Sequence, residues 1–564
     1  MIHNPILRKE VLTALRTRKA LAMQILFLLG TAVLIWLLWD PRGFQDLAGM
    51  EVRRILTVLA IGQLVMVALF SPAFTAAAIT SEREHRTLES LLASRMKPWE
   101  IALGKMAGSL TFILLLVLSG APALAAVFLL GGVSGAEVLA VEAILLLTAV
   151  YLGMFGLLVS TFMHRSYRAI IVTYAILLVV CLSAVVAWPI SDHMILRGGA
   201  AWQGVLHTIA SLSPLEAMLS VVQPNSTYCV GAQSMPPFWK MYIPLAVLIG
   251  AVTTLACLYR LHRPIAPPRP RERLKVVERG KMSARRFFFL IDPRMRKNMI
   301  RWWQNPVAIK EFRTRPMLQS HWLLRAIAVC LIVSVLLMFV VSLSVAALTG
   351  GRSNEDPTLL YPMMATAVAA LMVIVLVLIG PAMTGGALCG DRETGVWDLM
   401  RTTRLSGWTI VVGKFEASII PLLLLTMAMA PAMLILLYFN ANLWVNILRV
   451  FQVAGMTILF VGTAGMFFSS IFPRTSTATA WTYGLVVSIA LVSLLVLLAQ
   501  NLFSQQFVRS VYILNPVAAA MDAAGYPAIQ KLDLVPSHLR IFGVTTAVMF
   551  VVSVVRVMQM RRAS

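Results

Sequence analysis

Long apolar runs alternate with short polar segments along the whole chain. A helix that crosses a bilayer needs about 20 apolar residues, and the sequence holds roughly twelve runs of that length. The runs lie at 21–39, 56–79, 108–131, 139–162, 169–189, 241–259, 323–348, 361–388, 416–438, 447–472, 479–499 and 540–558. Backbone polar groups in lipid must be bonded within their own segment, so helices are expected. The pattern predicts an all-α integral membrane protein with about twelve transmembrane helices.

The second half of the chain repeats the first half at an offset of 309 positions. Matching pairs are Pro72 and Pro381, Thr75 and Thr384, Arg83 and Arg392, Glu84 and Glu393, Trp99 and Trp408, Gly153 and Gly462, Gly156 and Gly465, and Ser160 and Ser469. Each half holds an even number of predicted spans, so the two repeats run in the same direction. We therefore expect two parallel six-helix domains, 1–263 and 299–564.

The stretch between the halves, 264–298, is basic and rich in proline, which predicts an extended linker rather than a domain. Each half opens with a similar interfacial segment. In it, an Asn-Pro pair, which suits the start of a helix, is followed by a basic amphipathic stretch that should lie in the membrane interface. The residues of the interfacial segments are Asn4, Pro5, Lys9 and Glu10 in the first half, and Asn305, Pro306, Lys310 and Glu311 in the second.

Charge orients this arrangement. Hydrophobic residues make up 59% of the chain and charged ones 13%, yet the net charge is +24. The region from Arg260 to Arg315 carries seventeen Lys or Arg against four Asp or Glu, and the other basic clusters fall on the same side of the predicted spans. This asymmetry follows the positive-inside rule and places both termini and the linker in the cytoplasm. The excess charge is thereby explained by topology and anionic membrane lipids, not by nucleic acid.

One polar segment in each half has the pattern of a short amphipathic helix. Residues 82–92 and 391–400 place charges around apolar positions, between the second and third spans of each half. A loop that only returned to the bilayer would need turn residues instead. We expect these polar segments to dock a cytoplasmic partner, with Glu84 and Glu393 taking part.

The polar segments resemble the permease subunits of type 2 ABC transporters, the exporter branch with six spans per transmembrane domain. A glutamate, Gly-Thr, Glu-x-Leu-Leu, a proline and Ile-x-x-Gly-Lys carry the resemblance, with Arg86 and Val396 as departures. The resemblance implies coupling helices that seat in an ATPase. The implied residues are Glu82, Arg83, Glu84, Leu91, Leu92, Gly104 and Lys105 in the first half, and Asp391, Arg392, Glu393, Gly395, Leu399, Gly413 and Lys414 in the second.

The chain should not be an enzyme. No Gly-x-x-x-x-Gly-Lys-Ser/Thr loop occurs in the sequence, so ATP hydrolysis is expected on a partner ABC ATPase, in two copies, which would bind the ATP and magnesium. This chain is expected to bind no cofactor or metal, and accessory subunits are left open. The resemblance implies a multi-pass protein of a prokaryotic plasma membrane.

Other functions stay open at this point. A secondary transporter normally carries ionisable residues within its spans, where they bind a coupling ion. Here the middle of nearly every predicted span lacks such residues, and Glu142 and Glu416 lie near span ends. This argues against ion coupling but leaves a uniporter open. A membrane enzyme needs convergent acid–base groups, for which Asp192, His193 and His207 are the sole candidates. A non-transporting scaffold or sensor that transmits force from an ATPase is the third alternative. The substrate is not specified; a charge-poor interior favours a hydrophobic or amphipathic one.

Overall fold

The computed structural model describes most of the helical parts of the chain. The described residues lie within 50–84, 96–129, 131–163, 169–180, 207–222, 237–262, 304–314, 327–339, 360–493, 505–526 and 529–562, with short gaps, and at isolated positions elsewhere. The first interfacial segment (4–10), the stretch 88–95 and the predicted linker 264–298 lie outside them. Every regular element in the described part of the chain is helical.

The chain divides into two compact units. Unit 1 comprises Met1–Pro264, Ala346–Gly351 and Leu494–Val508, and unit 2 comprises Ile265–Val345, Arg352–Ser493 and Arg509–Ser564. The helices of unit 1 are α3 (Met50–Ala76), α4 (Ala78–Glu84), α6 (Pro98–Leu129), α7 (Gly135–Phe162), α10 (Pro214–Val222) and α12 (Phe238–His262). Helix α7 is central, because α3, α6, α10 and α12 all pack on it.

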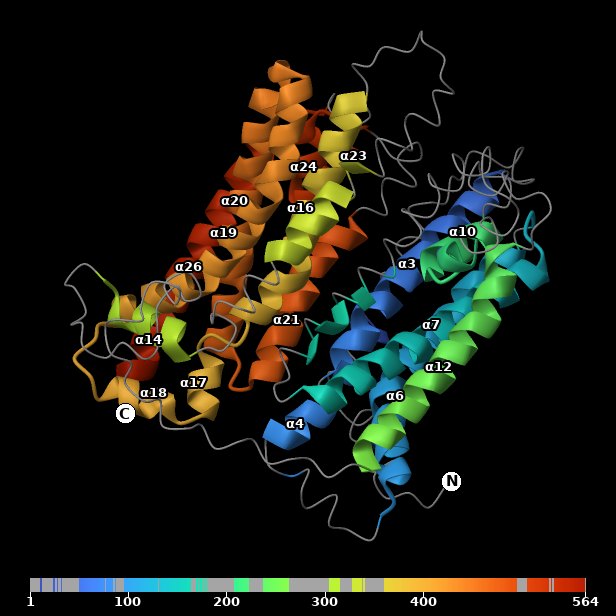
Figure 1. The fold of residues 1–564 in the computed structure, drawn as a ribbon, viewed down its shortest axis with the longest axis horizontal. Coiled ribbons are helices and arrows are strands. Elements are labelled where there is room, and N and C mark those ends of the chain that lie inside the picture. The colour runs from blue at the N-terminus through green and yellow to red at the C-terminus, as the bar shows by residue number, and fades with distance from the viewer. Residues whose placement is uncertain are drawn as a thin grey trace, which may run out of the picture. The chain divides into compact units, whose positions relative to one another are not determined.

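Unit 2 repeats this design with more of its elements described (Figure 1). Its helices are α14 (Pro306–Thr314), α16 (Leu360–Thr384), α17 (Cys389–Glu393), α18 (Val396–Arg401), α19 (Gly407–Phe439), η4 (Ala441–Leu443), α20 (Trp444–Ile471), α21 (Thr475–Val487), the π-helical turn η5 (Ser488–Val492), α23 (Gln505–Leu514), α24 (Pro516–Ala524) and α26 (Val535–Arg562). Helix α20 is central here, with α16, α19, α21, α24 and α26 around it.

Six helices of the described residues are long and apolar enough to cross a membrane: α7, α12, α16 continuing into α17, α19, α20 and α26. A seventh is added if the two bent parts of α6 count as one span. Only 22% of the apolar window is buried in α12 and in α26, so both helices present most of their side chains outward. Apolar side chains on the outside are stable in lipid rather than in water, and the chain is an all-α integral membrane protein, as predicted.

Glycines set the closest helix contacts, and they do so in the same way in both units. A Cβ atom at Gly156 of α7 would overlap Thr75 Oγ1 of α3, and one at Gly465 of α20 would overlap Thr384 Oγ1 of α16. Small residues let helix backbones approach closely in membranes, where packing replaces the hydrophobic effect. These contacts hold α3 against α7 in unit 1 and α16 against α20 in unit 2.

One expectation about the polar segments was wrong in detail. Residues 391–400 were expected to form one helix, but α17 and α18 are separated at Gly395. Gly395 has φ = 72°, a left-handed conformation that glycine adopts without the steric cost of a Cβ atom. The polar segment of unit 2 therefore changes direction in its middle.

Candidate functional site

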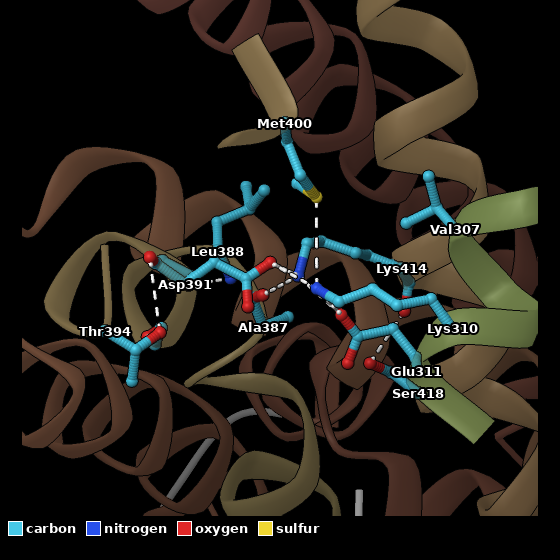
Figure 2. Close-up of polar contacts among 12 residues, drawn as sticks. Val307, Lys310, Glu311, Ala387, Leu388, Asp391, Thr394, Met400, Lys414 and Ser418 are labelled. Carbon is cyan, nitrogen blue, oxygen red and sulfur yellow. Dashed lines mark hydrogen bonds and ion pairs between the residues drawn. The ribbon is translucent and has the colours of Figure 1, made fainter. Parts of the chain in front are cut away.

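A buried lysine is the centre of the polar cluster in unit 2. Lys414, near the start of α19, has a side chain with 0% exposure. Its Nζ lies 2.5 Å from Asp391 Oδ2 and 3.0 Å from Glu311 Oε1, and it donates a hydrogen bond of 2.6 Å to the carbonyl oxygen of Ala387. A buried ammonium group is tolerated only when it is paired and hydrogen-bonded. The three acceptors of Lys414 meet that requirement (Figure 2).

A second lysine closes the cluster into a network. Lys310 Nζ lies 3.3 Å from both Glu311 Oε1 and Asp391 Oδ2, and its third neighbour is Met400 Sδ at 3.9 Å. Lys310 and Glu311 belong to α14, Asp391 to α17 and Lys414 to α19. The network therefore joins the interfacial segment, the polar segment and the third span of the repeat (Figure 2).

Apolar packing surrounds the network. Val307 of α14, Trp397 and Met400 of α18, Ile410 of α19 and Val557 of α26 belong to one buried cluster. Since the same core includes the interfacial segment and the polar segment, both are fixed to the ends of the spans by packing as well as by charge.

Asn305 anchors the start of the interfacial segment. Its Oδ1 accepts the N–H of Val307 at 3.0 Å, which caps α14, and its Nδ2 donates to the carbonyl oxygen of Thr409 at 2.9 Å. A Cβ atom at Gly413 would overlap Asn305 Oδ1. The glycine before Lys414 is thus the residue that lets the interfacial segment lie against α19.

Unit 1 has the matching ion pair. Lys105 is 8% exposed, and its Nζ lies 2.6 Å from Glu82 Oε1. Lys105 and Glu82 stand 309 positions before Lys414 and Asp391. The same lysine thus binds the same acidic position in both units.

A second contact recurs in both units, and it is made by a serine near the end of α7 and of α20. Ser160 Oγ accepts the N–H groups of Ile79 at 3.1 Å and Thr80 at 3.0 Å. Ser469 Oγ accepts those of Leu388 at 2.8 Å and Cys389 at 2.9 Å. These N–H groups lie just before the polar segment, so the serine fixes the place where the chain enters that segment.

Charged residues of the polar segments also bind the end of α7 in unit 1 and the start of α21 in unit 2. Arg83 donates to the carbonyl oxygens of Met163 at 2.6 Å and Thr161 at 3.1 Å. Burial lowers the pKa of Arg83 below its ordinary value, and the positive charge of Arg260 lowers it further. Glu393 accepts the N–H and the Oγ1–H of Thr475, both at 2.9 Å, at the first residue of α21. Both oxygens of Glu393 are therefore engaged within the chain.

The outward surface of the site is formed by α18. Trp397 and Met400 point into the core, whereas Leu399 is 70% exposed and the side chain of Asp398 is 77% exposed. Leu399 lies outside the membrane-spanning helices of the described residues. Helix α18 therefore presents one apolar side chain and one carboxylate on its exposed face, while its buried face is held by the core.

The residues predicted from the sequence separate into three groups. The buried and half-buried ones are Glu82, Arg83, Gly104, Lys105, Asn305, Pro306, Lys310, Glu311, Asp391, Arg392, Gly413 and Lys414, whereas Glu393, Gly395 and Leu399 are exposed. Asn4, Pro5, Lys9, Glu10, Leu91 and Leu92 lie outside the described residues, as does the side chain of Glu84. The buried members of the first group hold the site together and cannot themselves touch a partner.

Sequence reasoning missed the contacting roles of Ser160, Ser469 and Thr475. The two serines stand in register at the repeat offset, so the repeat contained the signal. The sequence around Thr475 contains no such signal, because the role of Thr475 depends on where Glu393 lies in the folded chain. Among the described residues no group of three His, Cys, Asp or Glu side chains gathers as a metal site.

Comparison with known proteins assigns a family to part of the chain. Residues 5–225 match the family model described as ABC-2 type transporter. A comparison with curated proteins found no match. The matched range includes Pro5, Lys9 and Glu10 of the first interfacial segment, the first polar segment, Lys105 and helix α7.

Proposed function

We propose that this chain, which carries an ABC-2 type transporter membrane domain at residues 5–225, is the fused permease of an ATP-driven exporter. An ABC-2 permease works with an ABC ATPase. In the proposed assembly two ATPase copies dock on the cytoplasmic ends of the two repeats, and the chain itself binds neither ATP nor magnesium. Both termini then face the cytoplasm of a prokaryotic plasma membrane.

The observation that carries the proposal is the exposed surface of α18 over a fixed interior. Leu399 and Asp398 face outward, and the Lys414 network lies directly behind them. A partner that pushes on α18 therefore pushes on α14 and α19 together, because buried ion pairs and a common apolar core resist their separation. Alternating access would follow from rigid movement of the spans driven by closure of the ATPase dimer.

The repeated contacts support a two-unit permease. The ion pair of Lys105 with Glu82 recurs as Lys414 with Asp391, and the serine contacts recur at the same offset. Side chains that keep both their sequence spacing and their partners indicate one ancestral module used twice. We infer that the second unit is a second ABC-2 membrane domain.

The chemistry of the spans supports an apolar or amphipathic cargo. In the described membrane-spanning helices, Glu142 and Glu416 are the eighth and tenth residues of α7 and α19, and the middle of each helix carries no Asp, Glu, Lys or Arg. A pathway between such helices offers little to a small ion. We propose a cargo with a large hydrophobic part, moved from the cytoplasmic side outward.

The test is a substitution on the exposed face. Leu399→Asp should abolish the association with the ATPase, because it replaces apolar contact area by a charge that the interface must desolvate. The tagged chain is purified from its own cells in mild detergent, and the ATP hydrolysis and the ATP-photolabelled subunit of the eluate are measured. We expect at least a tenfold loss of both, corresponding to about 1.4 kcal/mol or more of binding free energy.

Leu399→Met is the matched control. It keeps the apolar contact and should retain the ATPase, and both variants should keep the thermal unfolding midpoint of the wild type, since residue 399 lies outside the core. Wild-type protein that elutes without any ATP-binding subunit would contradict the proposal and favour a uniporter. ATPase association without cargo movement would favour a force-transmitting scaffold.

A further inference from the structure

Two polar side chains lie in the apolar interior of unit 1 without a hydrogen-bond partner among the described residues. Gln63 of α3 is 3% exposed, and neither atom of its amide group has a partner in that part of the chain. Both carboxyl oxygens of Glu142 in α7 are buried and lack a described partner as well. Buried polar atoms in folded proteins almost always have a partner, because an unpaired one costs free energy. This polar pair, Gln63 and Glu142, is therefore a candidate binding site.

Contacts between α6 and α7, which run in opposite directions, fix the level of the polar pair. A Cβ atom at Gly135 would lie 3.7 Å from the Phe128 ring, and one at Gly153 would overlap Leu110 Cδ2. The two contacts agree on one register, which places position 143 of α7 opposite Gly120 of α6. A Cβ atom at Gly120 would in turn overlap the amide group of the polar pair. The amide of α3 and the carboxyl group of α7 therefore lie at one level.

The carboxyl group also lies on the face of α7 that meets α3 and α6. Ser71 Oγ of α3 donates to the carbonyl oxygen of Ala149 at 2.7 Å, and a Cβ atom at Gly153 would lie 3.2 Å from the same Ser71 Oγ. Glu142 stands seven residues before Ala149 and eleven before Gly153, which is close to two and three full turns of a helix. All three residues therefore share one face, and Gly153 reaches α6 through Leu110.

Unit 2 has no counterpart of the polar pair. At the positions 309 residues after the pair and its neighbouring glycine, the sequence holds Met372, Met429 and Phe451. Met372 and Met429 are buried, so this level of unit 2 is filled by apolar side chains. The fold can therefore be built without polar side chains here, and the pair is a feature of unit 1 alone.

The carboxyl group of the polar pair has no ion pair among the described residues. Arg53 of α3 is bound to Glu137 at 3.0 Å. The other described ionisable side chains near this end of α7 are Glu216 of α10, and Lys240 and Tyr242 of α12, of which Lys240 is exposed. Helix α6 carries none at this level, and α4 packs at the opposite end of α7. A carboxyl group buried without an opposite charge takes up a proton instead of staying ionised.

We propose that Glu142 and Gln63 form a proton-binding site in unit 1, where the protonated carboxyl group donates a hydrogen bond to the amide oxygen. The proton comes from water at the end of α7 that carries Glu137, forms an O–H bond with the carboxylate, and returns to that water on release. The pair offers three oxygen atoms, whereas Ca²⁺ or Mg²⁺ takes about six. No Asp, Glu, Lys, Arg or His follows the pair along α3 or α7, so the site binds a proton without conducting it onward.

The site makes the packing of unit 1 depend on acidity. When the carboxyl group loses its proton, a charge in the apolar interior favours the entry of water, and α3, α6 and α7 separate more easily. Unit 2, with apolar side chains at this level, lacks this dependence. The site is separate from the exposed face of α18, so the inference does not rest on the ATPase partner or on the proposed exporter function.

The first test labels the full chain in detergent with dicyclohexylcarbodiimide, an apolar reagent that adds to protonated carboxyl groups, and quantifies the peptides by mass spectrometry. We expect at least about tenfold more label on Glu142 than on Glu137, because the ion pair with Arg53 favours the ionised form. The label on Glu142 should decrease as the pH rises, and sodium or magnesium chloride should leave it unchanged at constant pH. An unlabelled Glu142 would overturn the proposal. Protection by either salt would also overturn it and assign a metal cation to the site.

The second test follows the thermal unfolding midpoint of the purified chain against pH. Glu142→Gln keeps the site neutral, so its midpoint should fall less than that of the wild type as the pH rises, since ionisation of a buried carboxyl group destabilises the folded state. Glu416→Gln, at an exposed glutamate of α19, is the matched control and should keep the wild-type dependence.

A third variant tests the partnership of the two residues. Gln63→Met introduces the side chain that unit 2 has at this position, and it should lower the midpoint more in the wild type than in the Glu142→Phe background, because contacting residues are coupled. Equal effects in the two backgrounds would overturn the pairing. The same pH dependence in Glu142→Gln as in the wild type would overturn the proton site.

Discussion

Lys414 is fully buried, yet its position in the sequence resembles that of an ordinary basic residue near the end of a span. Its charge is compensated by Asp391 and Glu311, which come from elements 23 and 103 residues away. The role of a charged residue therefore depends on its burial and on its distance from opposite charges in the folded chain. Gly413, next to Lys414, and Asn305 of the interfacial segment let α14 lie close against α19.

Lys414→Met is expected to destabilise unit 2 strongly. The substitution keeps the length of the side chain but leaves two carboxylates with Lys310 alone, and breaking a buried pair costs about 3–5 kcal/mol. The thermal unfolding midpoint of the detergent-purified chain measures this. Lys97→Met, at an exposed lysine, is the control and should leave the midpoint unchanged. An unchanged midpoint in Lys414→Met would show that the network contributes no stability.

At the scale of elements, the repeat is a repeat of contacts as well as of sequence. Helices α3 and α7 of unit 1, and α16 and α20 of unit 2, meet at a glycine, and the serine one turn further binds N–H groups just before the polar segment. In unit 2 the interfacial segment and the polar segment then fold onto the third span. This order of contacts explains why the polar segments lie at the same place in both halves.

Gly465→Ala should lower the stability of the contact between α16 and α20. The new methyl group would overlap Thr384, and overpacking of this kind costs about 1–3 kcal/mol. Gly455→Ala is a control on the same helix, because nothing lies within 4 Å of its Cβ position. Gly455→Ala should be neutral or stabilising by up to about 1 kcal/mol. Equal unfolding midpoints for the two variants would contradict the assigned role of Gly465.

At the scale of the whole molecule, the chain contains two compact units that each have their own core. The predicted boundaries of the two domains and of the linker stay predictions, because the linker lies outside the described residues. The count of twelve spans stays a prediction for the same reason. What is established is a multi-pass helical membrane protein with an ABC-2 membrane domain in its first half.

Cutting the predicted linker should leave both units folded. A protease site inserted within 264–298 is cleaved after reconstitution, and the two fragments are followed by their retention in the membrane and by resistance to further proteolysis. Each fragment carries most of one compact unit with its buried apolar surface, so both fragments should stay in the bilayer and resist digestion. Rapid digestion of either fragment would mean that its fold depends on the covalent connection.

The sequence by itself determined the membrane location, the helical class, the repeat and the position of the polar segments. The length of the apolar runs and the offset of the repeat can be read directly along the sequence. A bilayer requires apolar runs of this length to form helices, because their backbone groups must be bonded within the segment. The sequence also contained the Asn305 cap of α14, which needs only local geometry to act. The register of the two serines can be read from the repeat, but their contacts join residues 80 and 81 positions apart and so depend on the tertiary structure.

Only the tertiary structure decided which predicted residues face inward. Lys414 and Leu399 belong to the same predicted set, but one is fully buried and the other is 70% exposed. A short polar segment that breaks at Gly395 has no helical period long enough to reveal its buried face. The partners of Glu393 and Arg561 come from distant parts of the chain, so they follow from packing in three dimensions and not from spacing along the sequence.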